Sequence, residues 1–163
     1  MSKLVLVSSI VPQAMQSATS PDGIPPAVIE SFRTAMLKDR AQFFLDVPTG
    51  PFFGFNRTQN AAAVSQGLIQ SWFVSGMQAG FKAVYETTHS WEVDYTDDLK
   101  GLTIPVLAIH GTDDQIVPFK TGGPRVPGIA KNGKVKVYEG GAHALPNTEP
   151  EKINADLWEF IQA

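Results

Sequence analysis

The 163-residue sequence contains no cysteine, which excludes disulfide bonds and thiolate metal sites. It also lacks an excess of basic charge, because 13 Lys and Arg stand against 16 Asp and Glu. Without a Lys/Arg cluster there is no electrostatic footprint for nucleic acid, so we expect no nucleic-acid partner. No apolar run approaches the roughly 20 residues of a membrane-spanning helix, and we expect no membrane partner either.

The amino terminus lacks the pattern of a secretory signal. The stretch "MSKLVLVSSIVP" is too short and too weakly basic for that role, so we expect a cytoplasmic protein. Its Val and Leu residues follow one another without strict alternation, which predicts a strand over residues 3–10 that is covered on both faces. Since buried parallel strands rarely open a fold, we expect that this strand was once preceded by a further segment.

The middle of the chain predicts helices. Prolines and glycines make residues 11–25 a loop, and the apolar spacing over residues 26–47 predicts one or two amphipathic helices. "PTGPFFGFNRTQ" then interrupts the helical pattern. Residues 62–77 and 78–89 predict two further helices.

The last third of the chain alternates between strand and helix patterns. Strands are expected over residues 106–109 and 134–141, with a short helix over residues 119–131 between them. A final amphipathic helix is expected after Thr148, where Glu151 completes a capping box. Strands that alternate with helices predict a parallel α/β sheet with right-handed crossovers.

These patterns divide the chain into three parts. Residues 1–12 form a core strand, residues 13–97 a helical cap, and residues 98–163 an α/β core. The helical insertion is too long for one crossover, so we expect it over the carboxyl ends of the strands, where open α/β sheets bind ligands.

An acid and a base follow two of these strands. Asp113 and Asp114 come directly after residues 106–111, and His143 follows the strand that ends in "VYEGG". Parallel strands lie about 4.8 Å apart, so loops at their carboxyl ends can bring a carboxylate to an imidazole. A carboxylate that accepts a hydrogen bond from one imidazole nitrogen leaves the other nitrogen free to act as a base. Taken singly, an aspartate here is commonly a turn former and a lone histidine a structural residue, and His110 fits that second description.

The residues around this pair resemble a known family. "PVLAIHGTDDQIVP" followed by "GGAH" looks like the end of an α/β-hydrolase, in which the acid precedes the histidine. Three further segments resemble the cofactor-free haloperoxidases and their aryl esterase and perhydrolase relatives: "AMLKDRAQFFLDVPTGPFFGFNR", "VSQGLIQSWF" and "DYTDDLKGLTIPVLAIHG". The resemblance covers essentially the whole chain. It implies the carboxyl-terminal part of an α/β-hydrolase fold, with parallel strands six to eight, flanking helices and a helical cap insertion.

The resemblance also implies an activity and its residues. The family contains serine hydrolases of small esters that can make peracids from a carboxylic acid and hydrogen peroxide, without metal or cofactor. Its catalytic acid and base fall on Asp114 and His143. Two classes of pocket residue are implied: Ile116 and Val117 beside the acid, and cap aromatics. The cap aromatics are Phe52, Phe53 and Phe55, for which ordinary cap packing is the alternative. Ala144 stands where relatives often have glycine.

The nucleophile of such an enzyme is missing from the chain. A nucleophile elbow requires Gly-x-Ser-x-Gly, and no serine here has glycine at both flanking positions. We therefore expect the chain to be inactive alone and to need a complementary amino-terminal hydrolase fragment. A core strand left at a sheet edge exposes unpaired backbone groups, so self-association through the first strand is the other expectation.

Three alternative functions stay open at this point. Dehalogenases and epoxide hydrolases place an aspartate on the same elbow, and the missing part would distinguish them. A truncated chain could also serve as a non-catalytic interaction module. A nucleotide-binding protein is weakly supported, because the sequence has neither G-x-G-x-x-G nor a P-loop.

Overall fold

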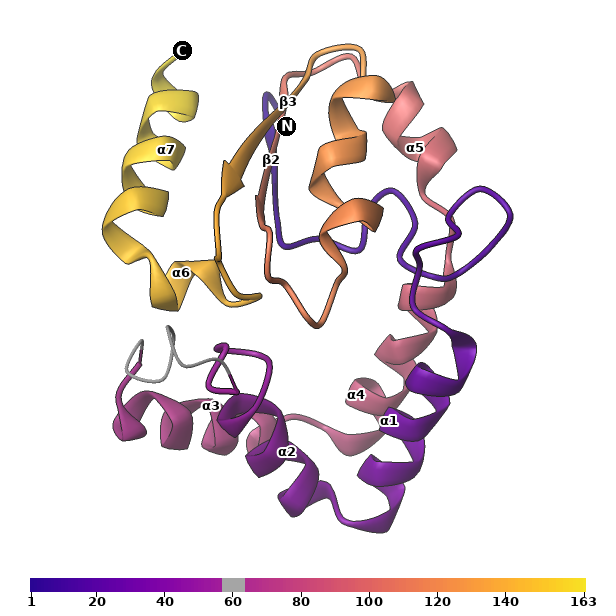
Figure 1. The fold of residues 1–163 in the computed structure, drawn as a ribbon, viewed down its shortest axis with the longest axis vertical. Helices are drawn as coiled ribbons and strands as arrows, with labels where there is room; N and C mark the ends of the chain where they lie inside the picture. The colour runs from indigo at the N-terminus through magenta and orange to yellow at the C-terminus, as the bar shows by residue number, and fades with distance from the viewer. Residues whose placement is uncertain (57–63) are drawn as a thin grey trace.

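The computed structural model describes residues 1–56 and 64–163 (Figure 1). Arg57 of the "PFFGFNR" segment and the expected helix start at residue 62 lie outside these ranges. The elements, in chain order, are β1 (Leu4–Val7), α1 (Pro26–Lys38), α2 (Arg40–Thr49), α3 (Gln66–Gln78), α4 (Phe81–Thr87), η2 (Thr88–Glu92), α5 (Thr96–Gly101), β2 (Val106–Gly111), η3 (Phe119–Thr121), η4 (Gly123–Gly128), β3 (Gly133–Tyr138), α6 (Leu145–Thr148) and α7 (Pro150–Gln162).

Three parallel strands form the sheet in the order β1-β2-β3. The central strand β2 pairs with β1 from Leu4↔Val106 onward and with β3 from Val106↔Gly133 onward. Every residue of β2 is buried, as its unbroken apolar run predicts. The prediction of a parallel α/β sheet is therefore confirmed.

Apolar residues cover both faces of this sheet. On one face, Leu4 and Leu6 of β1 pack on a cluster that includes Val106 and Val126. On the other face, Val5 and Val7 pack on a cluster of Leu107, Ile109, Tyr138, Leu145 and Ile153. The four residues of β1 thus point alternately into two cores, and this explains why they show no alternation of polar and apolar types.

One edge of β1 is open. Within the described residues, β1 pairs with a strand on one side only, and all four of its residues are half-buried. The strand is shorter than the expected residues 3–10, because the backbone turns at Ser8, which has a positive φ of 46°. An unpaired row of backbone N–H and C=O groups along an apolar strand can pair with another strand.

The cap lies beyond the carboxyl ends of the strands, where helices α1 to α4 form a separate layer (Figure 1). The expected helical region 26–47 is two helices, because Asp39 leaves the helical conformation with φ −156°. Its carboxylate then accepts a hydrogen bond from the backbone N–H of Gln42 at 2.9 Å and caps α2. Ser65 caps α3 in the same way, through the N–H of Leu68.

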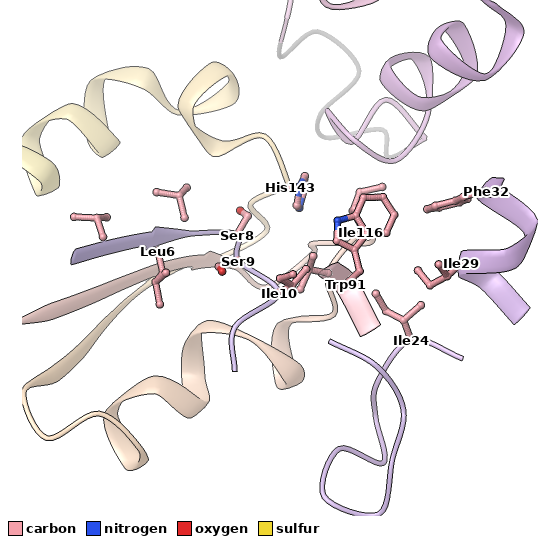
Figure 2. A pocket seen from close by; sticks show the side chains of 13 residues that line it. Leu6, Ser8, Ser9, Ile10, Ile24, Ile29, Phe32, Trp91, Ile116 and His143 are labelled. Atoms are coloured by element: carbon pink, nitrogen blue, oxygen red, sulfur yellow. The ribbon is translucent and has the colours of Figure 1, made fainter. Parts of the chain in front are cut away.

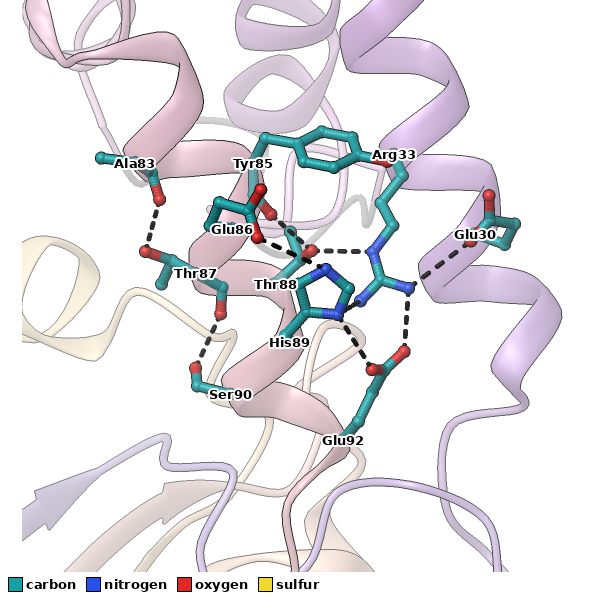
Figure 3. Close-up of polar contacts among 10 residues, drawn as sticks. All are labelled: Glu30, Arg33, Ala83, Tyr85, Glu86, Thr87, Thr88, His89, Ser90 and Glu92. Carbon is teal, nitrogen blue, oxygen red and sulfur yellow. Dashed lines mark hydrogen bonds and ion pairs between the residues drawn. The ribbon is translucent and has the colours of Figure 1, made fainter.

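A buried arginine joins the first cap helix to the end of the cap (Figure 3). Arg33 of α1 donates hydrogen bonds to Thr88 Oγ1 at 2.8 Å and to Glu92 Oε1 at 2.8 Å, both in η2. A third donor of the same guanidinium lies 3.0 Å from His89 Nδ1. Because the planar guanidinium is satisfied from several directions at once, it fixes the angle between α1 and η2.

Two local predictions were wrong. Residues 119–131 contain two 3₁₀ turns, η3 and η4, in place of one short helix, because glycines and prolines interrupt the segment. The expected capping box is absent: Thr148 ends α6, and α7 begins at Pro150 without a side-chain cap. Proline at a first helical position starts a new helix there. The apolar side of α7 nevertheless packs on the sheet, through Ile153.

None of the helices in the described part of the chain is long and apolar enough to cross a membrane.

We expect the substitution Arg33→Met to lower the melting temperature by several degrees. It retains the aliphatic packing of the side chain but leaves Thr88 and Glu92 without their buried donor. Thermal unfolding followed by circular dichroism measures the effect. Lys38→Met, an exposed position on the same helix, is the matched control, and an equal change in both variants would contradict a role for the network.

Candidate active site

The acid loop and the histidine loop leave the sheet side by side. β2 ends at Gly111 and β3 at Tyr138, and these two residues are paired in register. The backbone N–H of Thr112 donates to Tyr138 O at 2.9 Å, and that of Asp113 donates to Gly141 O at 3.1 Å. The two loops are therefore joined by main-chain hydrogen bonds before any side chain is considered.

Glycine at the end of β2 makes this approach possible. A Cβ atom on Gly111 would overlap the carbonyl of Gly141. Any other residue would push the histidine loop away from the acid loop. The "HG" and "GG" dipeptides thus reflect a close backbone approach.

Asp114 and His143 are in direct contact. His143 Nδ1 lies 2.9 Å from Asp114 Oδ2 and 3.1 Å from Oδ1. The aspartate side chain is fully buried, whereas the histidine side chain retains 19% exposure. An ionised carboxylate can only accept, so Nδ1 carries the proton and Nε2 is left with a free lone pair. The arrangement can move a proton at Nε2 while Asp114 holds the ring.

Four N–H groups surround the buried carboxylate. Oδ1 accepts from the backbone N–H groups of Ile116 at 2.9 Å and Val117 at 2.8 Å. Nε2 of the buried His110 lies 3.2 Å from Oδ2, the oxygen that His143 also contacts. Burial by itself would raise the pKa of Asp114, but hydrogen bonds from His110, His143 and the backbone lower it to about 2. Asp114 is therefore ionised at neutral pH.

A cavity of about 380 Å³ opens beside His143 (Figure 2). One part of it follows the open edge of β1. The other part is apolar and is lined by residues of the cap and of the acid loop: Ile24, Ile29, Phe32, Trp91, Ile116 and Val117. His143 lies between the two parts, so its ring is accessible from the apolar part.

Of the pocket residues expected from the sequence, Ile116 and Val117 line this cavity. Phe52, Phe53 and Phe55 do not. Phe53 is 1% exposed and lies in a cap core with Ile69 and Ala144. The Phe52 ring lies 5.1 Å from the His143 ring, and the Phe52 carbonyl accepts a hydrogen bond from Ala144 N–H. The segment of residues 52–55 therefore packs on the histidine loop through Phe52.

Several apolar lining residues were not anticipated, among them three from α1 and η2. Ile29 and Phe32 are one turn apart on α1, and Trp91 contacts Phe32 edge to face at 6.4 Å. Their helical spacing identifies an apolar side of α1. Spacing alone cannot distinguish residues that line a cavity from residues that fill a core.

Ser8 is a further polar group at the cavity. It is 6% exposed, and its hydroxyl has no hydrogen-bond partner within the described part of the chain. Its positive φ lies in a region that side-chain-bearing residues seldom adopt. The turn at Ser8 directs the chain away from the sheet at the same edge as His143.

The cap is attached to both loops of the site. Asn56 and Gln115 form a reciprocal amide pair, with Asn56 Nδ2 2.8 Å from Gln115 Oε1. On the histidine loop, the backbone N–H of Ala144 donates a hydrogen bond to the carbonyl of Phe52. Among the residues that the structure describes, no group of three His, Cys, Asp or Glu side chains could hold a metal ion.

Comparison with known proteins gives matches along almost the whole chain. The chain is 46% identical over 162 residues to the non-heme chloroperoxidase of Streptomyces lividans, and 41% identical to the bifunctional esterase/perhydrolase of Acinetobacter calcoaceticus. Each alignment covers 99% of this chain and 58% of the relative, so the chain spans little more than half the length of the curated relatives it matches. No protein-family model matches the chain.

Solved structures show the same fold. The bromoperoxidase of Bacillus anthracis superposes with a TM-score of 0.91 at 27% identity, over 99% of this chain and 58% of that one. An esterase of Exiguobacterium antarcticum superposes with a TM-score of 0.87 at 21% identity, covering 99% of this chain and 57% of the other. The sheet, the cap and the acid–histidine pair define the carboxyl-terminal part of an α/β-hydrolase. In sequence, the chain is similar along almost its whole length to non-heme haloperoxidases and to an esterase/perhydrolase.

We expect Gly111→Ala to separate the acid loop from the histidine loop. The added Cβ meets the Gly141 carbonyl, and overpacking of this kind costs about 1–3 kcal/mol. Chemical denaturation measures the loss. Gly128→Ala, where an added Cβ meets nothing within 4 Å, is the control, and equal stability of the two variants would show that the close approach is unimportant.

Stability should also depend on Asp114 in acid. Its pKa is lowered from 3.8 to about 2 on folding, so its contribution is complete above the unfolded value and is lost as the pH falls from about 4 to about 2. The shift corresponds to about 2 kcal/mol. In urea unfolding, the stability of Asp114→Asn should no longer fall between about pH 4 and about pH 2 because of this group. Asp113→Asn, which leaves the contacts of Asp114 in place, should retain this fall; if Asp114→Asn retains it too, the lowered pKa is refuted.

Proposed function

We propose that this chain is the acid–histidine part of a serine esterase and perhydrolase that acts on small carboxylic esters. The observation that carries the proposal is the contact between Asp114 and His143, with Nε2 of His143 free beside an apolar cavity. The names of the relatives support an esterase or haloperoxidase over a dehalogenase or epoxide hydrolase.

In the proposed reaction, His143 is the general base. Its Nε2 takes the proton of a serine hydroxyl while the serine oxygen attacks the ester carbonyl, and His143 then returns that proton to the leaving alcohol. Asp114 stabilises the imidazolium that forms in between. The serine and the oxyanion donors come from a segment outside this chain.

The second half of the reaction releases the acyl group. His143 takes a proton from water, whose oxygen attacks the acyl-serine carbonyl. The bond between the acyl carbon and the serine oxygen then breaks, His143 returns the proton to that oxygen, and a carboxylic acid is released. Hydrogen peroxide in place of water gives a peracid, which then oxidises halide. Neither step requires a metal ion or organic cofactor. A cytoplasmic location belongs to the same proposal.

Small acyl groups suit the apolar part of the cavity. Ile116 and Val117 follow the acid directly, and Phe32 and Trp91 face them from the cap. We place the acyl chain among these four side chains. Phe52 acts in this scheme by packing on the His143 ring, while Phe53 and Phe55 support Phe52 from the cap core.

The open edge of β1 is the proposed docking place of the missing part. The cavity continues along residues 5–9 of this edge and reaches His143. A strand paired there would carry its own carboxyl end to the same side of the sheet, and a nucleophile elbow follows such a strand. A second copy of this chain could pair with the same edge, but it would bring no elbow.

Complementation tests the proposal. We expect the chain mixed with the amino-terminal segment of a related esterase, carrying Gly-x-Ser-x-Gly, to hydrolyse p-nitrophenyl acetate, while each part alone does not. His143→Ala should reduce the restored rate at least a hundredfold, because general base catalysis typically contributes about 10²–10⁴-fold. Release of p-nitrophenol measures the rate.

His89→Gln is the matched control, because His89 lies half-exposed on the cap, away from the cavity. It should leave the restored rate within about twofold of the wild-type value. Activity that survives His143→Ala would rule out the assigned base. Sedimentation of the isolated chain tests the other use of the edge: a dimer that the amino-terminal segment cannot dissociate would favour self-association.

A further inference from the structure

We propose that His110 is a positioning residue that orients the Asp114 carboxylate from β2, as a hydrogen-bond donor through Nε2. His110 is the fifth residue of β2 and is completely buried. It does not line the cavity and touches no substrate in the proposed reaction. The proposal deepens the proposed function, and its catalytic consequence rests on that function.

The hydrogen bonds of His110 determine its tautomer. The backbone N–H of Gly123 donates to Nδ1 at 3.0 Å, so Nδ1 must carry a lone pair. The proton is therefore on Nε2, which lies 3.0 Å from the carbonyl of Val117 and 3.2 Å from Asp114 Oδ2. The Nε2 N–H donates to the Val117 carbonyl, and Asp114 Oδ2 lies within 3.2 Å of the same nitrogen.

The surroundings select the neutral ring. A second proton, on Nδ1, would face the Gly123 N–H at 3.0 Å, donor against donor. The ring has no room to turn away from this contact. A Cβ on Gly122 would lie 2.5 Å from His110 Cε1, and the Phe119 ring packs edge-on at 5.8 Å between ring centroids.

A neutral donor has a particular advantage behind a catalytic carboxylate. The titratable groups that face Asp114 are His110 from β2 and His143 from the loop after β3, and Asp113 precedes it in the chain. A cation behind Asp114 would neutralise the charge that His143 needs when it becomes an imidazolium. The neutral His110 stabilises the ionised form through its dipole and leaves the net negative charge in place.

His110 also restricts the orientation of the carboxylate. Oδ1 is held by the two backbone N–H groups of Ile116 and Val117, and Oδ2 lies between His110 and His143. Since the same His110 N–H bonds the Val117 carbonyl, it links the acid loop to β2. Loss of this donor would leave Oδ2 held by His143 alone.

Nuclear magnetic resonance of the 163-residue chain tests the tautomer directly. We expect the ¹⁵N shifts of His110 at pH 7 to show a proton on Nε2 and none on Nδ1. A doubly protonated ring, or a proton on Nδ1, would overturn the proposal. This measurement needs no substitution, so it decides the point even if a variant fails to fold.

Substitution tests the effect on Asp114. The ¹³Cγ resonance of Asp114 follows its titration, and we expect His110→Phe to move the midpoint upward by roughly one pH unit or more, because burial is then opposed by fewer hydrogen bonds. His110→Gln, which keeps an N–H donor at the position of Nε2, should restore most of the shift. Val126→Ala, fully buried but absent from the contacts of Asp114, is the control for general destabilisation. An unchanged midpoint in His110→Phe, or an equal shift in Val126→Ala, would refute the role.

The catalytic consequence is measured in the complemented enzyme. His110→Phe should lower kcat about tenfold or more at pH 7 with KM little changed, and His110→Gln should recover most of it. If kcat is retained in His110→Phe while its Asp114 midpoint shifts, positioning of the acid by His110 is refuted. If complementation itself fails, the resonance experiments on the chain still decide the state of His110.

Discussion

Parallel pairing on both sides of β2 is the constraint on which the rest of the molecule depends. The strand is buried along its whole length and is in register with β1 on one side and β3 on the other. All three strands therefore end at the same edge of the sheet. The acid loop, the histidine loop and the turn at Ser8 leave that edge together, and the cap closes over it. Without this pairing, residues 29 positions apart would not share a hydrogen bond.

The cost of burying Asp114 explains much of the local structure. An isolated carboxylate in a protein interior would become neutral, because its charged form loses its hydration. Here two backbone N–H groups, His143 and His110 replace the lost water. The turn after Gly111 supplies the two backbone N–H groups, and β2 supplies His110. The proposed role of His143 as a base depends on the charge that remains on Asp114.

The open edge of β1 lies beside the candidate site. In a parallel α/β sheet the reacting groups come from several strand ends, and each strand contributes its own loop. The described residues place a carboxylate, an imidazole and an apolar cavity wall at this edge of the sheet. Its relatives are longer, and the chain matches 58% of their length. In the proposed function, the unpaired edge of β1 is where a strand that carries the nucleophile would pair.

Much of the fold was accessible from the sequence. The strand positions and the helical cap followed from apolar patterning, and the rule that parallel strands end together placed Asp113 and Asp114 near His143. The family resemblance then selected Asp114. The exceptions were local: the glycine- and proline-rich region after Phe119 forms 3₁₀ turns, and Pro150 displaces the start of α7 from Thr148. In both places backbone restrictions outweighed side-chain patterns.

The sequence by itself determined which residues can do chemistry and which strand each of them follows, because these depend on residue type and on the order of elements. Only the tertiary structure decided what surrounds them. It placed Phe32 and Trp91 in the cavity wall, placed Phe53 in a cap core, and put His110 behind Asp114. Such contacts depend on the angle between the cap and the sheet and on distances of a few ångströms between loops. They arise from the packing of distant segments, which no local spacing of residues encodes.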